Sequence, residues 1–394
     1  MATFNNFMDA SLHPPALDHQ PADEAGCPLS WAMLDTRAYI ADRRNATTAY
    51  GRTSTGVEFQ VTFCTAPPPV VSYFCVWCPE EPNLDRLHPE PRILATEADI
   101  VVLGVTVCPP NCSYGSQSEI FVYQAGDPSL HRVVGHTGIH LYFNIGILHQ
   151  PDCNGNTKID DPFYLIGLHP SERPWDKFRH SASKVVMIGE EDLMGFVDLW
   201  RGILVFDVLS CTRLYHIPLP EPLVKGKQHR HPDDPTMSRD IAAVQGGIKV
   251  VDCSRCPASG HWKASVWSRK ATSREEEDWK MEHTLEICDD LVDSTTTLHL
   301  ELLPVLDVDG VPRRTLEGLH ITYPKLSLND DDIVYFMAKV DPRDENAWVL
   351  AVDMRTNKLQ DVGVFRAKIS SGAASPYVHS TVMTSRITKY LSRP

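Results

Sequence analysis

The sequence of 394 residues lacks the short motifs that mark common catalytic and nucleotide-binding sites. It contains no G-x-S-x-G nucleophile motif, no G-x-x-x-x-G-K-S/T or G-x-G-x-x-G phosphate-binding loop, and no H-E-x-x-H zinc motif. Hydrolases, nucleotide-binding proteins and metalloproteases of these types are therefore not indicated. We assign no catalytic, cofactor-binding or metal-ligating residue from the sequence, and we expect no cofactor.

Long apolar runs and basic residues are also scarce. The most apolar run, residues 100–107, is far shorter than the ~20 residues of a membrane-spanning helix. Lys and Arg number 37 against 51 Asp and Glu, so the formal net charge is −14, whereas neutralising phosphates needs the opposite sign. We therefore expect neither a membrane nor a nucleic-acid partner. The basic run at residues 225–231 is interpreted as a solvated loop rather than a nuclear-import signal.

The start of the chain lacks lysine and arginine, of which the first is Arg37. A secretory signal needs a basic segment followed by an apolar one, and a transit peptide is rich in arginine. The first thirty residues carry instead four prolines and four acidic residues. We expect residues 1–29 to form a disordered, acidic, proline-rich leader. We expect a cytoplasmic or nuclear protein without a signal or transit peptide.

Eleven cysteines are scattered along the chain, and an odd number cannot all pair within one chain. Three pairs have short spacings: Cys75 with Cys78, Cys253 with Cys256, and Cys108 with Cys112. In a reducing compartment we expect free thiols, many of them buried. The alternative is that the first two pairs supply four thiolates to one zinc ion. The sequence leaves open whether these pairs ever bind a metal.

Other candidate ligands have simpler interpretations. His136 and His140 have helical spacing, but glycines surround them, and in a strand they lie about 13 Å apart. Residues 152–161 resemble a calcium loop but lack its twelfth-position Glu, which favours an ordinary Asn-Gly turn. Adjacent acidic residues are interpreted as solvated turns, and they occur at 190–191, 289–290 and 330–332.

Prolines and short strand patterns dominate what is present. Thirty prolines exclude a fold made mainly of long helices. Residues 57–63 alternate between apolar and polar, which is typical of a half-buried strand, and residues 70–77 form a continuous apolar run typical of a strand buried on both faces. Similar runs occur at 100–107, 120–123, 184–188, 202–209, 248–252, 264–267, 333–340 and 348–353. The pattern predicts an all-β fold.

Several of these runs resemble one another. The similar pairs are 98–104 with 331–337, 203–207 with 349–353, and 121–133 with 265–281. A unit of ~40–50 residues built from short strands is typical of a β-propeller blade. We predict that residues 30–394 form a single β-propeller-like domain of about seven degenerate four-stranded blades, with six to eight allowed. The alternative is two packed β-sandwich-like domains divided near residue 180.

Several blocks of the sequence resemble a plant family, expanded in grasses, that carries the domain of unknown function number 1618. These blocks are residues 34–39, 42–48, 66–75, 195–204 with 217–220, and 348–354, and the most specific region is about 190–355. The resemblance implies a fold similar to the propeller-like regions that follow F-boxes in plant ubiquitin-ligase adaptors, and it implies no known activity. The leader shows no helical F-box pattern, so we expect no F-box arm for Skp1.

The most specific block also has a structural interpretation. Four of its residues are expected to face a blade core: Val197, Leu199, Ile203 and Val205. Trp200 is expected at the blade boundary, and Gly202 at a bulge or a close backbone approach. Pro218 and Pro220 are expected to end the following strand. We therefore interpret the block as blade packing rather than a functional site.

The sequence favours a non-enzymatic protein-interaction scaffold, whose protein partners it does not identify. A propeller presents loops and a central mouth to other molecules, although this rests on the fold alone. The first alternative is an enzyme with a site in the central channel, which needs a pocket with perturbed ionisable groups. The second is a zinc-stabilised structural protein, which unfolds when a chelator removes the metal.

Overall fold

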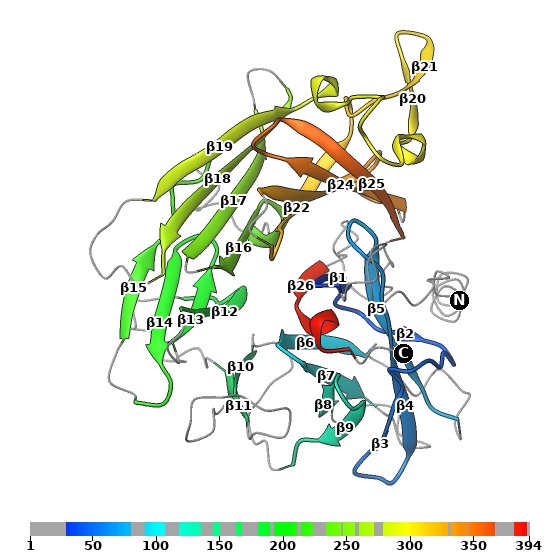
Figure 1. Ribbon diagram of the computed structural model, residues 1–394, viewed down its shortest axis with the longest axis vertical. Helices are drawn as coiled ribbons and strands as arrows, with labels where there is room; N and C mark the ends of the chain where they lie inside the picture. The colour runs from blue at the N-terminus through cyan, green and yellow to red at the C-terminus, as the bar shows by residue number, and fades with distance from the viewer. Residues whose placement is uncertain are drawn as a thin grey trace. The chain divides into compact units, whose positions relative to one another are not determined.

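The structure is a computed structural model, and its described residues are almost entirely β-strand (Figure 1). It describes residues 29–79, 91–106, 118–134, 145–149, 163–167, 180–189, 193–210, 214–223, 234–245, 247–256, 260–271, 279–329, 332–344, 346–366 and 382–391. The helices among them are single 3-10 turns, and no helix in these ranges is long and apolar enough to cross a membrane. The predicted leader lies outside the described residues except for Leu29.

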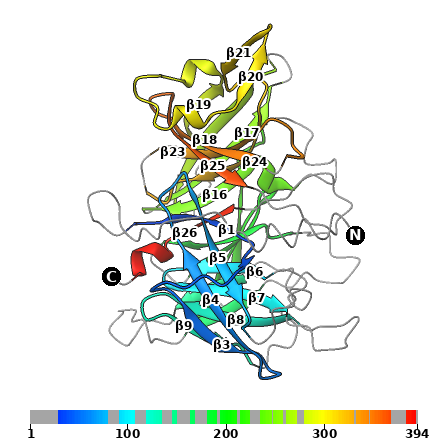
Figure 2. The same cartoon turned by 90° about the vertical axis from the view of Figure 1, so that its right-hand side faces the viewer.

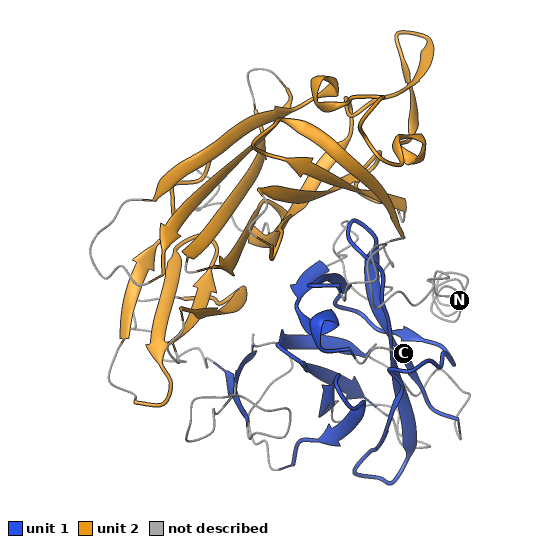
Figure 3. Cartoon of the chain, viewed as in Figure 1, with its two compact units in different colours: residues 1–167, 368–394 blue, residues 168–367 orange. Residues whose placement is uncertain are grey.

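The chain divides into two compact units (Figure 3). Unit 1 comprises residues 1–167 and 368–394, and unit 2 comprises residues 168–367. The first sheet of unit 1 has the order β26-β1-β5-β4-β3, with β2 also paired to β5. Its strands are β1 (Ala32–Asp35), β2 (Tyr39–Ile40), β3 (Ala49–Arg52), β4 (Glu58–Cys64), β5 (Val71–Trp77) and β26 (Val382–Ser385).

The second sheet of unit 1 is an antiparallel meander in chain order. Its strands are β6 (Arg92–Glu97), β7 (Ile100–Thr106), β8 (Ser118–Gln124) and β9 (Ser129–Arg132). A two-stranded sheet follows, made of β10 (Ile145–His149) and β11 (Phe163–Gly167). Ile145 and Ile147 of β10 share an apolar cluster with residues of β6, β7 and β8, so this hairpin extends the core of the second sheet.

Unit 2 contains three antiparallel meanders of four strands, each in chain order. The first has β12 (Lys184–Ile188), β13 (Leu193–Asp198), β14 (Gly202–Asp207) and β15 (Leu214–Pro218). The second has β16 (Arg239–Val244), β17 (Gly247–Arg255), β18 (Trp262–Lys270) and β19 (Lys280–Ile287). The third has β22 (His320–Leu326), β23 (Ile333–Lys339), β24 (Asn346–Asp353) and β25 (Lys358–Arg366). A separate hairpin of β20 (Val305–Val308) and β21 (Val311–Arg314) lies between the last two meanders in the chain.

The fold is therefore all-β and of the β-propeller type, with five blades among the described residues: two in unit 1 and three in unit 2. The prediction of propeller blades is confirmed, and the prediction of about seven is wrong. The predicted number of blades came from dividing the length of the chain by a typical blade length, which assumes that every segment belongs to a blade. Among the described residues, β10 with β11 and β20 with β21 form two-stranded sheets rather than four-stranded blades.

The internal similarities of the sequence match equivalent strands of different blades. Residues 98–104 and 331–337 fall on β7 and β23, which are both second strands of their blades. Residues 203–207 and 349–353 fall on the third strands β14 and β24. β7 is buried at every residue and β23 at all but its first, so side chains on both faces of these strands are covered, which explains their continuous apolar runs.

The C-terminal strand closes the first sheet of unit 1. β26 pairs antiparallel with β1, in the register Ala32 with Ser385 through Asp35 with Val382. The turn that follows, η6 (Ile387–Tyr390), buries Ile387 completely, and Leu391 is also buried. Both residues belong to the apolar cluster shared by the two blades of unit 1. The first and last described strands of the chain are thus parts of one sheet.

The family-like block packs as its sequence indicates. The four predicted core residues of the block are all buried in a cluster between the first two blades of unit 2. A Cβ at Gly202 would lie 2.2 Å from His216 Nε2 and 2.5 Å from the Ile217 carbonyl oxygen, so the predicted close approach is confirmed. β15 ends at Pro218, also as predicted.

A buried arginine of the second blade, held in an ion pair within its own blade, also bonds to the first. Arg239 at the start of β16 has its Nε 3.1 Å from Asp252 Oδ2, and both side chains are inaccessible to solvent. Its Nη1 donates to the Leu199 carbonyl at 2.8 Å, and its Nη2 donates to the Pro220 carbonyl at 2.7 Å. The guanidinium therefore satisfies two carbonyls of the neighbouring blade, which supports blade packing as the role of this block.

Candidate interaction surface

The connection from β19 to β22 is unusually long for two adjacent blades. Residues 288–319 separate the two strands, and we call them the 288–319 insertion. It carries η4 (Asp289–Leu291), η5 (Leu300–Leu302) and the β20–β21 hairpin, which projects from unit 2 in both views (Figures 1 and 2). Connections within compact domains have a median length of ~4–6 residues, and long ordered ones are commonly functional.

Hydrogen bonds at Asp289 join the two ends of the insertion. The carboxylate of Asp289 accepts a bond from the Leu316 backbone N–H at 2.7 Å and from Thr315 Oγ1 at 2.8 and 2.9 Å. Four leucines of the insertion are buried in the apolar core of unit 2, namely Leu291, Leu303, Leu316 and Leu319. The predicted solvated turn at 289–290 is therefore, at Asp289, an anchor of the insertion.

The middle of the insertion is fixed to the outer edge of the last blade. The Leu298 backbone N–H donates to the Gln360 carbonyl at 2.8 Å, and Trp348 Nε1 donates to the Leu302 carbonyl at 2.6 Å. His299 Nδ1 lies 2.8 Å from Asp361 Oδ1, and this hydrogen bond raises the pKa of the His299 imidazole. Because that pair is largely exposed, its contribution to stability is small, and the backbone contacts hold the segment.

A tight turn shapes the projecting hairpin. Asp309 and Gly310 both have positive φ, 55° and 80°, which is the conformation of a type I′ turn. Asp307 Oδ1 accepts a hydrogen bond from the Gly310 backbone N–H at 2.8 Å and closes the turn. Asp-Gly directly between two valines, Val308 and Val311, is a hairpin signal, so the sequence contained evidence for this element, although the strands predicted above do not include it.

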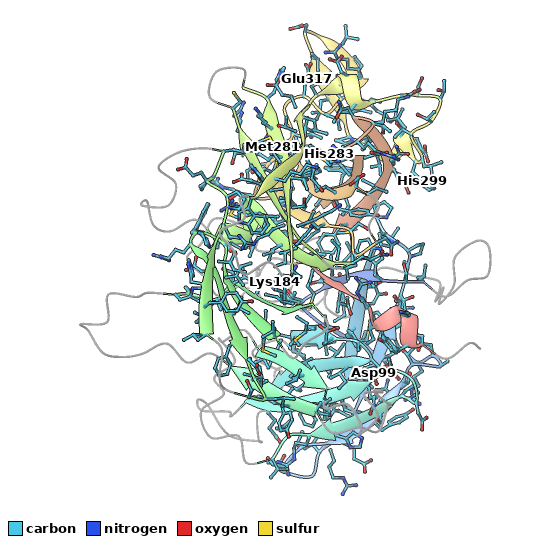
Figure 4. The ribbon with its side chains drawn as sticks, turned by 60° about the vertical axis from the view of Figure 1, so that its left-hand side comes forward. Asp99, Lys184, Met281, His283, His299 and Glu317 are labelled. Carbon is cyan, nitrogen blue, oxygen red and sulfur yellow. The ribbon has the colours of Figure 1, made fainter. Side chains whose placement is uncertain are left out.

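The insertion exposes aliphatic side chains on this fixed frame. The exposed fractions are 60% for Leu298, 38% for Leu302, 53% for Val305 and 59% for Val311. Isolated exposed aliphatic residues are common on protein surfaces. Here four belong to one anchored insertion, where Figure 4 also shows His299 and Glu317. Such a surface is suited to contact with another protein.

Unit 2 also has a small polar pocket between its last two blades. Three ionisable side chains line it, namely Lys249 of β17, His283 of β19 and Asp332 before β23, and Glu282 of β19 joins them through Lys249. Lys249 Nζ lies 3.2 Å from Asp332 Oδ1 and 3.5 Å from Glu282 Oε2. Glu282 is the extra residue of a β-bulge opposite β18, which explains how two consecutive strand residues reach one pocket.

Glu282, His283 and Asp332 each place a potential metal-ligand atom within 4.8 Å of the others. The Lys249 ammonium already lies against both carboxylates, so it offsets part of their charge and competes with any cation. Asp332, which we predicted in a solvated turn, has a left-handed backbone with φ of 54° and is only partly exposed. The group is therefore best described as an ionic link between two blades.

The first strands of the three blades in unit 2 share a third charged cluster. Lys184 of β12 donates from Nζ to Asp240 Oδ1 of β16 at 2.9 Å, and Lys325 Nζ of β22 lies 3.8 Å from the same oxygen. Burial raises the pKa of Asp240, but the two lysines outweigh it, so this carboxyl has a lowered pKa. Burial lowers the pKa of Lys325. Neither Asp240 nor Lys325 lines the pocket at Lys249.

The structure separates the cysteine pairs that the spacing had joined. Cys75 lies on one face of the first sheet, with Cys64 and Tyr73, whereas Cys78 belongs to the apolar cluster on the other face. Residues three apart in a strand point to opposite sides, so Cys75 and Cys78 do not converge on one ion. Cys253 lies in the apolar core of unit 2, and Cys256 follows the end of β17, also three positions on.

Several other sequence candidates lie outside the described residues. These are His136 with His140, Cys108 with Cys112, residues 152–161, residues 190–191 and the basic run 225–231. Trp200 lies in the turn between β13 and β14, where its backbone N–H donates to Asp198 Oδ1 at 3.0 Å. Its placement at a blade boundary stays a prediction.

Comparison with known families supports the resemblance derived from the blocks. Residues 196–335 match the model of a family described as protein of unknown function, DUF1618. No curated protein matches the chain. The matched range extends from β13 to β23, and it includes the 288–319 insertion and the four ionisable residues at Lys249. The predicted family resemblance is confirmed over these residues, within the region of 190–355 that we identified as most specific.

Proposed function

We propose that the protein is a non-enzymatic interaction scaffold, and that the 288–319 insertion is the surface that its protein partners contact. One observation carries this proposal: the insertion is anchored by buried leucines and backbone bonds, yet it exposes four aliphatic side chains. Core packing does not require those four side chains, because the anchoring leucines of the same insertion are separate residues. Their exposure is explained if another protein covers them.

The energetic argument is simple. Burying a Val or Leu side chain fully contributes about 1.5–3 kcal/mol, so partial burial of these four provides a useful share of a binding free energy. A frame that is already ordered loses little conformational entropy on binding, so more of that free energy appears as affinity. The net charge of −14 favours partners with basic surfaces, because opposite charge increases the rate of encounter.

The test compares two full-length variants. The first carries L298S, L302S, V305T and V311T, which remove the exposed aliphatic groups of the insertion. The matched control carries L209S and L214S, which remove two exposed leucines elsewhere in unit 2. Partners are identified with quantitative cross-linking, and each is then purified and measured by calorimetry. We expect at least tenfold weaker binding for the insertion variant and no change for the control. Equal binding by all three proteins would reject the insertion as the contact surface.

An enzyme is the second candidate, and the pocket at Lys249 is the observation that favours it. An imidazole, an ammonium and two carboxylates meet there. Lys249 lies within 3.5 Å of both carboxylates, so the two acidic groups and the ammonium are already engaged with one another. The exposed insertion therefore supports the scaffold better than the pocket supports an enzyme.

A further inference from the structure

The two strands of the projecting hairpin have different free edges. In a type I′ hairpin the residues flanking the turn exchange hydrogen bonds, and the pairs then alternate. Val308 with Val311 and Leu306 with Arg313 are therefore the bonded pairs. The backbone groups of the alternate residues point outward: Val305 and Asp307 on β20, and Pro312 and Arg314 on β21. Among the described residues, β20 and β21 pair only with each other.

Pro312 blocks one of the two edges. Its outward position has no N–H to donate, and a proline on an edge strand is a common protection against pairing with another chain. β20 has no such block, because Val305 and Asp307 both keep outward N–H and carbonyl groups. Only the β20 edge therefore presents a complete set of backbone partners for a further strand.

We propose that the free edge of β20 binds an extended segment of a protein partner as a third strand, with a basic residue facing Asp307 and an apolar residue facing Val305. This inference rests on the proposed scaffold function and names the chemical class of the bound segment. Backbone hydrogen bonds supply affinity in such complexes, and alternate side chains supply specificity. Val305 is 53% exposed and offers apolar surface to the added strand.

Charge selects the basic class of segment. Asp307 and Asp309 are exposed at the hairpin tip, and no cationic side chain of the described residues forms an ion pair with Asp307. Opposite charges on facing positions of neighbouring strands are favourable, and like charges are unfavourable. A second copy of the chain would bring another acidic β20 to the same edge. The same argument therefore disfavours self-association through β20 and favours a basic partner segment.

The test uses a displayed library of random ten-residue peptides, selected on the full-length chain. Selected peptides are measured against V305P and V305T. Proline at 305 removes the outward N–H without breaking a bond to β21, whereas threonine keeps the backbone edge and removes only apolar surface. We expect binders with Lys or Arg between apolar residues, at least tenfold weaker binding to V305P, and less than threefold weaker binding to V305T.

Three other results overturn the inference. Equal losses with V305P and V305T would show docking through side chains, binding unaffected by V305P would place the peptides elsewhere, and concentration-dependent self-association abolished by V305P would identify a second copy as the occupant. If V305P does not fold, amide exchange of the wild-type chain decides, because Val305 and Asp307 must gain protection when a peptide binds. A partner that binds V305P but not the variant with four substitutions in the insertion would leave the scaffold function intact. It would reject only the proposal that the partner pairs with the β20 edge.

Discussion

In unit 2 the buried carboxylate of Asp240 lies close to two lysines, of which Lys325 is buried and Lys184 is partly exposed. Asp240 faces both Lys184 and Lys325, and the Leu326 backbone N–H also donates to it at 3.2 Å. Lys325 follows a bulge in β22 where Tyr323 has a positive φ of 49°. This irregular backbone costs conformational energy, and it places the Lys325 side chain next to the Asp240 carboxylate.

Removing the anion and removing one cation are predicted to have very different effects. D240N leaves two ammonium groups without their carboxylate, and we expect a loss of about 3–5 kcal/mol in the free energy of unfolding. K325M removes a buried charge whose pKa is already lowered by burial, while Lys184 keeps its 2.9 Å contact with Asp240. We expect K325M to change the stability by less than about 1.5 kcal/mol. Urea denaturation of both variants measures the difference.

The pH dependence gives an independent check of the same residue. The pKa of Asp240 is lower in the folded protein than its ordinary value. Its stabilisation is therefore present above the unfolded carboxyl pKa of about 4 and is lost as pH falls through the folded pKa. Below pH 4, wild type should lose stability more steeply than D240N. Parallel curves for the two proteins would show that the Asp240 carboxylate does not provide this stabilisation.

Among the structural elements, the C-terminal turn η6 packs into the apolar cluster that the two blades of unit 1 share. Ile387 is fully buried in their shared cluster, while its neighbour Lys389 is exposed. I387A removes three carbons from this packed position, and we expect a loss of about 2–5 kcal/mol. K389A is the control on the same turn and should change stability by less than about 0.5 kcal/mol. Chemical denaturation measures the stability of both variants. A similar small change for the two would contradict the proposed role of Ile387 in joining the two blades.

The strands were predictable from the sequence because apolar runs map directly onto central blade strands. The run at 333–340 contains β23, and the run at 70–77 contains β5. The blade number was not predictable from length. Residues 133–183 and 288–319 have the composition of loops with occasional strands, and nothing in their periodicity says whether they build a further blade.

The candidate site was predictable only in part, for two different physical reasons. Asp309 and Gly310 form a local turn whose signal is complete within four residues, so the hairpin was accessible from sequence. The pocket at Lys249 was not accessible. It needs a bulge at Glu282 and a contact with Asp332, about fifty residues later in the chain, and neither feature has a local pattern. The zinc alternative for Cys75 and Cys78 rested on their spacing alone, which ignores that residues three apart in extended chain point to opposite sides.

In the whole molecule, the segments that form unit 1 lie before and after unit 2 in the chain. Unit 1 is discontinuous, since its segments 1–167 and 368–394 flank the whole of unit 2. Its closing pair joins β1 to β26, strands that are separated by most of the chain. Unit 1 is therefore complete only after the chain has passed through residues 168–367. Such a pairing of distant segments is slow to form.

This order predicts that residues 30–394 unfold as one cooperative domain. If unit 2 unfolds, the two segments of unit 1 are joined by a flexible loop of the 200 residues 168–367. Closing a loop of that length costs about 5 kcal/mol, which is comparable to the whole stability of a typical domain. A folded unit 2 holds its ends at a fixed separation and removes most of that cost. Unit 1 should therefore lose its stability when unit 2 unfolds.

Differential scanning calorimetry tests this prediction on the full-length chain. One transition, with the calorimetric enthalpy equal to the van't Hoff enthalpy, is the expected result. The variants locate the coupling, because I387A lies in unit 1 and D240N lies in unit 2. If the units are coupled, both variants shift the single transition without splitting it. Two transitions, of which I387A shifts one and D240N shifts the other, would show that the units unfold independently and that the single-domain prediction is wrong.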